Sequence, residues 1–412
     1  MRVLFVHQNF PAQFRHVAQF LEQAGDQVIA VTDAKNTQAR LVKTLEYHVE
    51  PALVGTPPPP LAPFAGQVVR ARAVAEVMLN LRNKGFIPDL VIGHVGWGEC
   101  LAVRDIWPAT KFGIHAEFYY ASEGANIGFD PEFQSLLSFD ERFAVRLRNA
   151  PLLLSMTDAD FGIAPTIWQK ERYPASLKSK IHVFHEGVDT DLVAPSQSSN
   201  FVLPSGRALT AHDEVITFVN RNLEPYRGYH IFMRALPRVL AERQNAHVVI
   251  VGGNGASYGP APQDGRSWKD IFFNEVKDSL PADRVHFVGK IPYASFIALM
   301  QLSSAHVYLT YPFVLSWSML EAMSASALVI ASKTAPVEEV ITDNDNGLLF
   351  NFFDIETLAD IVIEALAEPS RFSEIRENAR RHIVEQYDLK RRCLPQWTNF
   401  VRQFDPVRRG SA

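Results

Sequence analysis

Two arginines on either side of a glutamate lie in the segment 220–228 (NRNLEPYRG), directly after an apolar run. That run, 215–219, predicts a strand, and the residues after the segment have the apolar spacing of a helix. Guanidinium groups bind diphosphate oxygens through paired hydrogen bonds, and a helix N-terminus adds a favourable dipole. We therefore expect Arg221 and Arg227 to bind a phosphorylated ligand, with Glu224 orienting one of them. Two solvated surface arginines are the alternative.

A carboxylate, Glu321, follows the aromatic segment 311–316 (YPFVLS). Ser316 is predicted to cap a helix whose apolar face carries Leu320 and Met323. Among apolar neighbours a carboxylate needs a hydrogen-bond donor, because an unpaired buried charge is costly. A sugar hydroxyl could supply that donor, and so could a backbone N–H group or an arginine.

Motifs for other chemistries are missing from the sequence. The first apolar run is followed by 7–12 (HQNFPA), which lacks the glycines of a dinucleotide site, and 252–255 (GGNG) lacks the lysine of a phosphate-binding Walker loop. No nucleophile elbow and no histidine–carboxylate motif with metal spacing occurs. We expect neither a metal nor a cofactor.

Composition bounds the class of protein. A chain of 412 residues favours two domains, and its net charge of −5 provides no general attraction to nucleic acid. The only cysteines, Cys100 and Cys393, are far apart, which argues for a reducing compartment. No apolar run is long enough to span a bilayer, and the N-terminus is too short and polar for a signal peptide. The expected location is the cytoplasm.

Short apolar runs alternate with helical segments through both halves of the chain, which predicts two doubly wound α/β domains with parallel sheets. We place a first domain at 1–190, a breaker-rich linker at 191–213, a second domain at 214–388 and a C-terminal segment at 389–412. In that last segment, Trp397, Phe400 and Phe404 suit a helix that packs back on the first domain.

The order of these motifs resembles glycosyltransferase family 4, whose members are retaining enzymes of the GT-B fold that use a nucleotide-sugar donor. The resemblance spans nearly the whole chain and is strongest from 221 to 350. It rests on six stretches in order: 186–191 (EGVDTD), 221–228 (RNLEPYRG), 249–253 (VIVGG), 288–289 (VG), 320–323 (LEAM) and 329–331 (VIA). The fold it implies is GT-B, with two Rossmann-like domains facing an interdomain cleft.

The resemblance also implies roles for individual residues. Arg221 and Arg227 would hold the donor diphosphate, Glu321 would bind the ribose, and His115 would contact the donor sugar or the leaving phosphate. The first glutamate of the family's Glu-x7-Glu signature falls on Phe313, a departure at the sugar contact. The remaining donor-side candidates are Glu224, Gly252, Gly253, Lys290, Ile291, Val314, Leu315 and Ser316. A structural role is the alternative for His115.

For the acceptor, the candidates in the first domain are Asn9, Phe10 and His94. A glycan, a lipid-linked sugar or a small molecule would fit the family. A basic run comprises Arg142, Arg146 and Arg148. It could make a peripheral membrane contact, and a solvated helix face is the alternative.

These features predict a metal-independent, retaining hexosyltransferase that uses a UDP- or GDP-sugar, with a role in cell-surface polysaccharide or glycoconjugate synthesis. Two alternatives stay open. One is an inverting GT-B transferase or a sugar-nucleotide epimerase. The other is a non-catalytic subunit that binds a nucleotide sugar, which Phe313 would suit.

Overall fold

The computed structural model describes residues 1–50, 56–133 and 137–406. The chain divides into two compact units. Unit 1 comprises residues 1–187 together with 389–412, and unit 2 comprises 188–388. The segment expected as a linker, 191–213, therefore belongs to unit 2, where 200–202 and 208–210 form an antiparallel hairpin.

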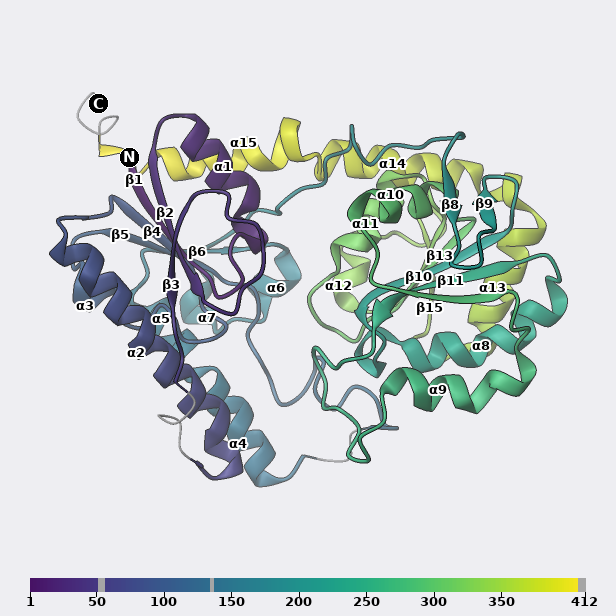
Figure 1. Ribbon diagram of the computed structural model, residues 1–412, viewed down its shortest axis with the longest axis horizontal. Helices are drawn as coiled ribbons and strands as arrows, with labels where there is room; N and C mark the ends of the chain where they lie inside the picture. Colours follow the sequence, from purple (N-terminus) through teal and green to yellow (C-terminus); the bar gives the residue numbers. More distant parts are fainter. Residues whose placement is uncertain (51–55, 134–136, 407–412) are drawn as a thin grey trace. The chain divides into compact units, whose positions relative to one another are not determined.

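Among its described residues, unit 1 contains a seven-stranded sheet in the order β3-β2-β1-β4-β5-β6-β7, in which the paired strands are parallel (Figure 1). Its strands are β1 (Arg2–Val6), β2 (Gln27–Asp33), β3 (Lys43–Tyr47), β4 (Leu90–His94), β5 (Lys111–His115), β6 (Phe161–Ala164) and β7 (Ile181–Val183). Its α-helices are α1 (Arg15–Gln23), α2 (Ala62–Asn83), α3 (Val103–Ile106), α4 (Phe139–Arg148), α5 (Ala150–Asp158), α6 (Ile167–Glu171), α7 (Ala175–Lys178) and α15 (Leu394–Arg402).

The long helix α2 was not predicted, because its apolar residues do not form a single stripe. Val74 and Met78 are buried, whereas Val68 and Leu79 are exposed. A helix with apolar residues on several sides gives no clear period of 3.6.

The C-terminal helix α15 packs on α1 within unit 1, as the sequence predicted (Figure 1). Trp397 and Phe400 are buried in the same apolar cluster as Phe5 and Phe14. The last helix therefore completes the core on one face of the first sheet.

Unit 2 contains, in the part of the chain that the structure describes, a six-stranded parallel sheet in the order β12-β11-β10-β13-β14-β15. Its strands are β10 (Val215–Asn222), β11 (His247–Gly253), β12 (Val285–Gly289), β13 (Ala305–Tyr308), β14 (Val329–Ser332) and β15 (Leu348–Phe350), besides the hairpin strands β8 (Asn200–Val202) and β9 (Ala208–Thr210). Its α-helices are α8 (Tyr229–Glu242), α9 (Trp268–Val276), α10 (Tyr293–Leu302), α11 (Trp317–Ser324), α12 (Ala335–Glu338), α13 (Ile355–Ala367) and α14 (Ser373–Gln386).

The two sheets share one topology, which determines where a ligand can bind. In each, the chain builds strands outward from the first strand in one direction and then in the other, so the order reverses beside β1 in unit 1 and beside β10 in unit 2. In doubly wound sheets, ligands bind outside the carboxyl ends of the strands at such a reversal. The prediction of two Rossmann-like parallel-sheet domains is confirmed.

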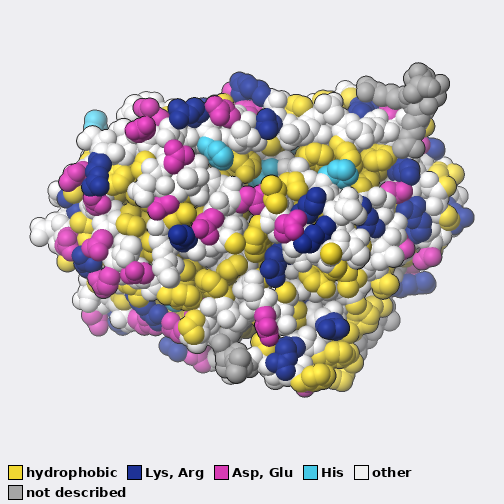
Figure 2. Space-filling view, turned by 180° about the vertical axis from the view of Figure 1, so that it is seen from behind, with side chains coloured by type: hydrophobic (Ala, Val, Ile, Leu, Met, Phe, Trp, Pro, Cys, Tyr) yellow, Lys and Arg dark blue, Asp and Glu magenta, His cyan; other side chains and the backbone are white. Residues whose placement is uncertain are grey.

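Acidic and basic side chains are interspersed over the face seen in Figure 2. In the described parts of the chain, no helix combines the length and the apolar character needed to cross a membrane.

Candidate active site

Three histidines gather at the carboxyl edge of the sheet in unit 1. His7 directly follows β1, His94 ends β4 and His115 ends β5, and these strands are neighbours in the sheet. The ring centroids of His7 and His94 are 4.9 Å apart, and those of His94 and His115 are 5.5 Å apart. The Trp97 ring stacks on His94 with a centroid separation of 4.4 Å. Topology thus assembles a polar cluster at the point where the strand order reverses.

A hydrogen-bond chain leads from His7 to the carboxylate of Glu117. The backbone N–H of Asn9 donates to Nδ1 of His7 (2.8 Å), so the His7 proton is on Nε2, which faces Oε1 of Gln13 at 3.0 Å. Nε2 of Gln13 in turn donates to Oε1 of Glu117 (2.7 Å).

The second oxygen of Glu117 is bound by His94. The backbone N–H of Gly96 donates to Nδ1 of His94 (3.1 Å), which leaves its Nε2–H to donate to Oε2 of Glu117 (3.2 Å). Both carboxylate oxygens therefore accept one hydrogen bond from a side chain whose orientation is fixed by its own neighbours.

These contacts determine the charges in the cluster. Burial, together with His94, lowers the pKa of His7 well below its usual value. The same two causes lower the pKa of His115 to about 3. Burial opposes ionisation of Glu117, but the neighbouring His94, the hydrogen bond that it donates, and the nearby His115 and His7 lower the pKa of Glu117 to about 2. Because Nδ1 of His7 and Nδ1 of His94 each accept a backbone N–H, neither ring carries a second proton, and the cluster is an ionised Glu117 beside neutral imidazoles.

His115, a predicted catalytic residue, is fully buried in unit 1. Its Nε2 lies 3.1 Å from Oε1 of Glu186, and its Nδ1 has no hydrogen-bond partner among the described residues. Of the acceptor-side candidates, only His94 joins the cluster through its side chain. Asn9 is exposed and contributes its backbone N–H, and Phe10 lies in the apolar core.

In unit 2, predicted donor-side residues meet at the carboxyl ends of β10, β11 and β12. Arg221 is exposed near the end of β10, which extends beyond the predicted strand as far as Asn222. A Cβ atom on Gly253 would lie 2.5 Å from Oδ1 of Asn222 and 3.1 Å from Cε of Lys290, so both side chains lie close to the backbone of this glycine. Gly252 lies against Leu223. Lys290 itself is exposed, so two cations flank the end of β11.

Arg227 is turned into unit 2. It is 3% exposed, its Nη1 donates to Oγ1 of Thr310 (2.7 Å), and its guanidinium carbon lies 4.9 Å from the ring centroid of Tyr258. Burial by itself lowers the pKa of Arg227, but Tyr308, Tyr258 and other neighbours raise it. The two arginines of the motif therefore have different surroundings, one exposed and one internal.

The carboxylate of Glu224 holds a loop. It accepts hydrogen bonds from the backbone N–H groups of Ser257, Tyr258 and Gly259 at 3.1–3.3 Å. Burial raises the pKa of Glu224, and these N–H donors oppose the rise. Its hydrogen bonds come from backbone groups, and its charge also raises the pKa of Arg227, so the orientation of an arginine by Glu224 stays a prediction.

Phe313 stands where the family signature has a glutamate, and it is buried among aromatic rings. It packs edge-on against Tyr226 and Tyr258, with centroid distances of 5.6 and 5.2 Å. The next residues, Val314 and Leu315, are partly buried, and Leu315 packs on the core of unit 2.

Ser316 caps α11 as predicted, since its side chain accepts from the backbone N–H of Ser318. Its own backbone N–H donates to the Tyr308 hydroxyl at 2.8 Å.

Glu321 accepts a hydrogen bond from a side chain of unit 2. The hydroxyl of Tyr293, the first residue of α10, donates to Oε1 of Glu321 at 2.6 Å. Burial raises the pKa of Glu321, and this hydrogen bond opposes the rise. Ile291, between Lys290 and Tyr293, packs on the core of unit 2.

The predicted basic run lies on α4. Arg142 and Arg146 are exposed, and Arg148 stacks over Tyr120 with its guanidinium carbon 3.7 Å from the ring centroid. Phe139 and Phe143, on the same helix, stack on each other and are exposed. Basic and aromatic side chains therefore share the surface of this helix.

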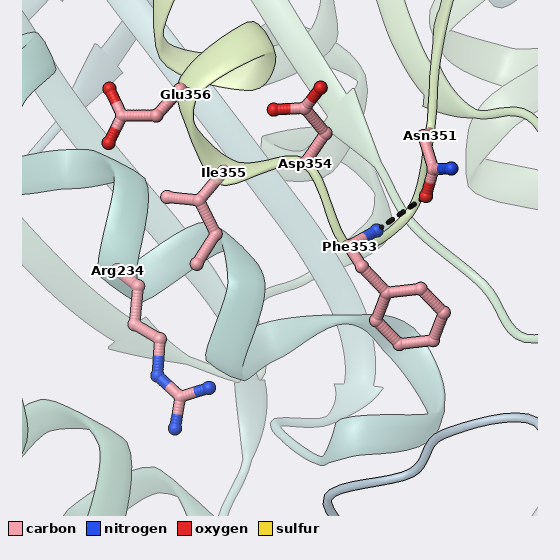
Figure 3. Close-up of a pocket in the computed structure, with 6 residues that line it drawn as sticks. All are labelled: Arg234, Asn351, Phe353, Asp354, Ile355 and Glu356. Carbon is pink, nitrogen blue, oxygen red and sulfur yellow. Dashed lines mark hydrogen bonds between the residues drawn. The ribbon is translucent and has the colours of Figure 1, made fainter.

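A separate surface pocket of unit 2 is drawn in Figure 3. Arg234 reaches it from α8, and Ile355 and Glu356 line it from the start of α13. The backbone N–H of Phe353 donates to Oδ1 of Asn351 (3.1 Å) at its rim. Its lining contains none of the predicted site residues.

Sequence reasoning missed several residues of both sites, chiefly Gln13, Trp97, Glu117, Tyr258, Tyr293, Tyr308 and Thr310. The sequence did contain one signal for the histidine cluster: His7, His94 and His115 each stand at the end of a short apolar run that predicts a strand. Because carboxyl ends of parallel strands share one edge, that pattern predicts a common cluster.

Two family models match the chain. Residues 24–193 match the glycosyl transferase family 4 group, and residues 206–382 match the glycosyl transferases group 1. The chain is 24% identical over 333 residues to D-inositol 3-phosphate glycosyltransferase of Corynebacterium aurimucosum, a match that covers 79% of this chain and 72% of the relative. It is 21% identical to the GDP-mannose-dependent monoacylated alpha-(1-6)-phosphatidylinositol monomannoside mannosyltransferase of Corynebacterium glutamicum, with 94% of each chain covered.

Solved structures share the fold over the full length of the chain. Sucrose-phosphate synthase from Thermosynechococcus elongatus superposes with a TM-score of 0.72 at 17% identity, covering 99% of this chain and all of that one. The Anabaena protein HepE, solved in complex with UDP-glucose, has a TM-score of 0.66 at 18% identity, covering 98% and 99% of the two chains. With one family model matching most of each unit and a Rossmann-like parallel sheet in both, the chain belongs to the glycosyltransferases described by these two models, the family 4 group and group 1.

Proposed function

We propose that this chain transfers a hexose from a nucleoside diphosphate sugar to an acceptor hydroxyl, with retention of the anomeric configuration and without a metal ion. The observation that carries the proposal is a pair of exposed cations in unit 2, Arg221 at the end of β10 and Lys290 after β12, on either side of the end of β11. Of the similar structures, that of HepE is a complex with UDP-glucose, which supports a nucleotide sugar as the kind of ligand.

Arg221 and Lys290 would act on the leaving group. Negative charge grows on the diphosphate as the bond to the sugar breaks, and fixed cations near it lower the barrier. Two protein cations can supply this stabilisation, so the proposal assigns no role to a metal. The internal Arg227 would support the same region by anchoring Thr310 and Tyr308.

Glu321 is proposed to bind the ribose hydroxyls. These hydroxyls would either replace the hydrogen bond from Tyr293 or be accepted in addition to it. A carboxylate that already accepts a hydroxyl at 2.6 Å can accept another hydroxyl in the same way. The base would be uracil or guanine.

The acceptor is proposed to bind to unit 1, at the cluster formed by His7, His94 and Glu117. A glycan or lipid-linked sugar fits this role, and the exposed phenylalanines and arginines of α4 support a contact with a lipid surface. Synthesis of a polysaccharide or glycoconjugate would be the resulting process.

One observation favours a second function, a non-catalytic subunit that binds a nucleotide sugar. The signature position for the sugar contact is occupied by Phe313, which is packed against Tyr226 and Tyr258. A ring cannot replace the hydrogen bonds that a carboxylate makes to sugar hydroxyls.

The test is thermal denaturation with a panel of UDP- and GDP-sugars, followed by transfer assays with the sugars that bind. A ligand that binds the folded state raises the melting temperature with its occupancy. Arg221→Ala should reduce that rise at a given sugar concentration, whereas Arg371→Ala, at an exposed arginine elsewhere in unit 2, should preserve it. Retention is read from the product anomer by NMR. Binding without transfer or donor hydrolysis would favour the non-catalytic subunit.

A further inference from the structure

We propose that Glu117 binds the acceptor hydroxyl that receives the sugar, and that it restricts the groups beside this hydroxyl to neutral or positively charged ones. The inference rests on the glycosyl transfer proposed above. It assigns a binding residue and a selectivity that neither the motifs nor the relatives' names contain.

Glu117 is the accessible end of the histidine cluster. Its side chain is 29% exposed, whereas that of His94 is 3% exposed and His7 and His115 are buried. A molecule that approaches this edge of unit 1 therefore meets the carboxylate before the imidazoles.

The carboxylate retains hydrogen-bonding capacity after its internal contacts are made. An ionised carboxylate offers about four acceptor positions on two oxygens. Gln13 occupies one on Oε1 and His94 occupies one on Oε2. Each oxygen can thus accept a further hydrogen bond from a ligand hydroxyl.

The position of the carboxylate is fixed from two sides. Gln13 is held by His7, whose ring is oriented by the Asn9 N–H. His94 is oriented by the Gly96 N–H and by stacking on Trp97. A binding group that is already ordered loses little entropy when the ligand arrives, so this arrangement suits ligand binding. Gln13 and His94 are positioning residues in this account.

The charge of the cluster determines the selectivity. With the imidazoles neutral, Glu117 contributes a net negative charge at the accessible end. A hydroxyl donates to that charge and an ammonium group is attracted by it, whereas a phosphate beside the reacting hydroxyl is repelled.

Glu117→Gln tests the proposal, because the amide has nearly the same shape and no charge. Its single oxygen cannot accept from both Gln13 and His94 in the native arrangement. We expect the kcat/KM for the acceptor to fall about 10- to 150-fold, the effect of losing one charge-assisted hydrogen bond. Hydrolysis of the donor by water should fall as well, whereas the Kd for the donor should stay unchanged. The matched control is Glu22→Gln, which removes an exposed carboxylate from α1.

Paired acceptors test the selectivity directly. Glucose is compared with glucose 6-phosphate, and myo-inositol with inositol 3-phosphate, using the donor that binds best. The native protein should use the neutral member of each pair better, and Glu117→Gln should reduce that preference. Better use of the phosphorylated members, or unchanged acceptor kinetics and hydrolysis in Glu117→Gln, would overturn the proposal.

A second variant covers the case in which Glu117→Gln fails to fold. Gln13→Leu removes one support but leaves the charge, so acceptor kcat/KM should fall while the preference for neutral acceptors remains. A purely structural role would lower the melting temperature of Gln13→Leu without changing the kinetics of the folded fraction, which contradicts the proposal. Failure of the native protein to bind any nucleotide sugar would instead refute the glycosyl transfer on which the inference rests.

Discussion

The hydroxyl of Tyr293 donates a 2.6 Å hydrogen bond to Oε1 of Glu321, joining the first residue of α10 to the middle of α11. The contact supplies the donor that a carboxylate among apolar residues requires. Glu321 itself is partly exposed, and Tyr293 is 51% exposed.

Glu321→Gln should weaken binding of the nucleotide about 10- to 150-fold and leave the fold intact, because one charge-assisted hydrogen bond to ribose is lost. Tyr293→Phe is the companion variant, since it removes the internal donor and leaves the carboxylate available. Titration calorimetry with UDP and GDP measures both. A Glu321→Gln protein with native affinity and a lowered melting temperature would show that Glu321 is a packing residue.

The same pair predicts a pH effect on stability. Burial raises the pKa of Glu321 in the folded state, so the folded state binds the proton more tightly than the unfolded one. Its contribution is therefore fully favourable below the unfolded pKa and is lost as the pH rises through the folded pKa. Tyr293→Phe should enlarge this loss, because it removes the hydrogen bond that stabilises the charged form. Urea unfolding of both proteins at pH 4 and pH 7 gives the comparison.

The two arginines of the donor motif should respond differently to truncation. Arg221→Ala should weaken diphosphate binding about 10- to 150-fold and spare stability, since the side chain is exposed. Arg227→Ala should lower the free energy of unfolding by about 2–4 kcal/mol, because it empties an internal site and removes the hydrogen bond to Thr310. Chemical denaturation and nucleotide titration of both variants check this. Native stability in Arg227→Ala would contradict the internal placement.

Phe313→Glu should destabilise unit 2 by about 2–4 kcal/mol, because it puts a carboxylate among Tyr226 and Tyr258. It should also change the preference among donor sugars if this position faces the sugar. Phe313→Leu, which keeps an apolar side chain, is the control and should cost less. Unchanged donor preference in a folded Phe313→Glu protein would mean that the family signature is misaligned at this residue.

Acid should destabilise unit 1 through its buried histidine. The pKa of His115 is lowered to about 3 by burial and by His94, so the unfolded state binds the proton more tightly. The stabilisation is present above the unfolded value near 6.5 and is lost as the pH falls toward the folded value. The free energy of unfolding should fall by about 1 kcal/mol per pH unit in this window for this group. His115→Asn should reduce the slope measured by urea unfolding, whereas His48→Asn, at an exposed position, should not.

The local pattern of apolar and polar residues was sufficient to predict the architecture of the two domains. Alternating apolar runs and amphipathic helices predicted both parallel sheets, because strands covered on both faces require continuous apolar sequence. It also predicted the Ser316 cap and the return of α15, whose Trp397 and Phe400 needed an apolar surface to cover. Helix α2 was not predicted, because its apolar residues are spread around its circumference and give no helical period.

The partners of the polar side chains were decided only by the tertiary structure. Gln13 and Glu117 are 104 residues apart, and Arg227 and Thr310 are 83 apart, so no sequence window contains either pair. Residue type indicated that Glu321 needed a hydrogen-bond donor, but only the tertiary structure determined that this donor would be a tyrosine. It also determined that Arg227 would contact a threonine and Glu224 a backbone loop. An ionised or polar group binds whatever donor the packing brings within reach, and that depends on how distant segments meet rather than on the residues beside it in the chain.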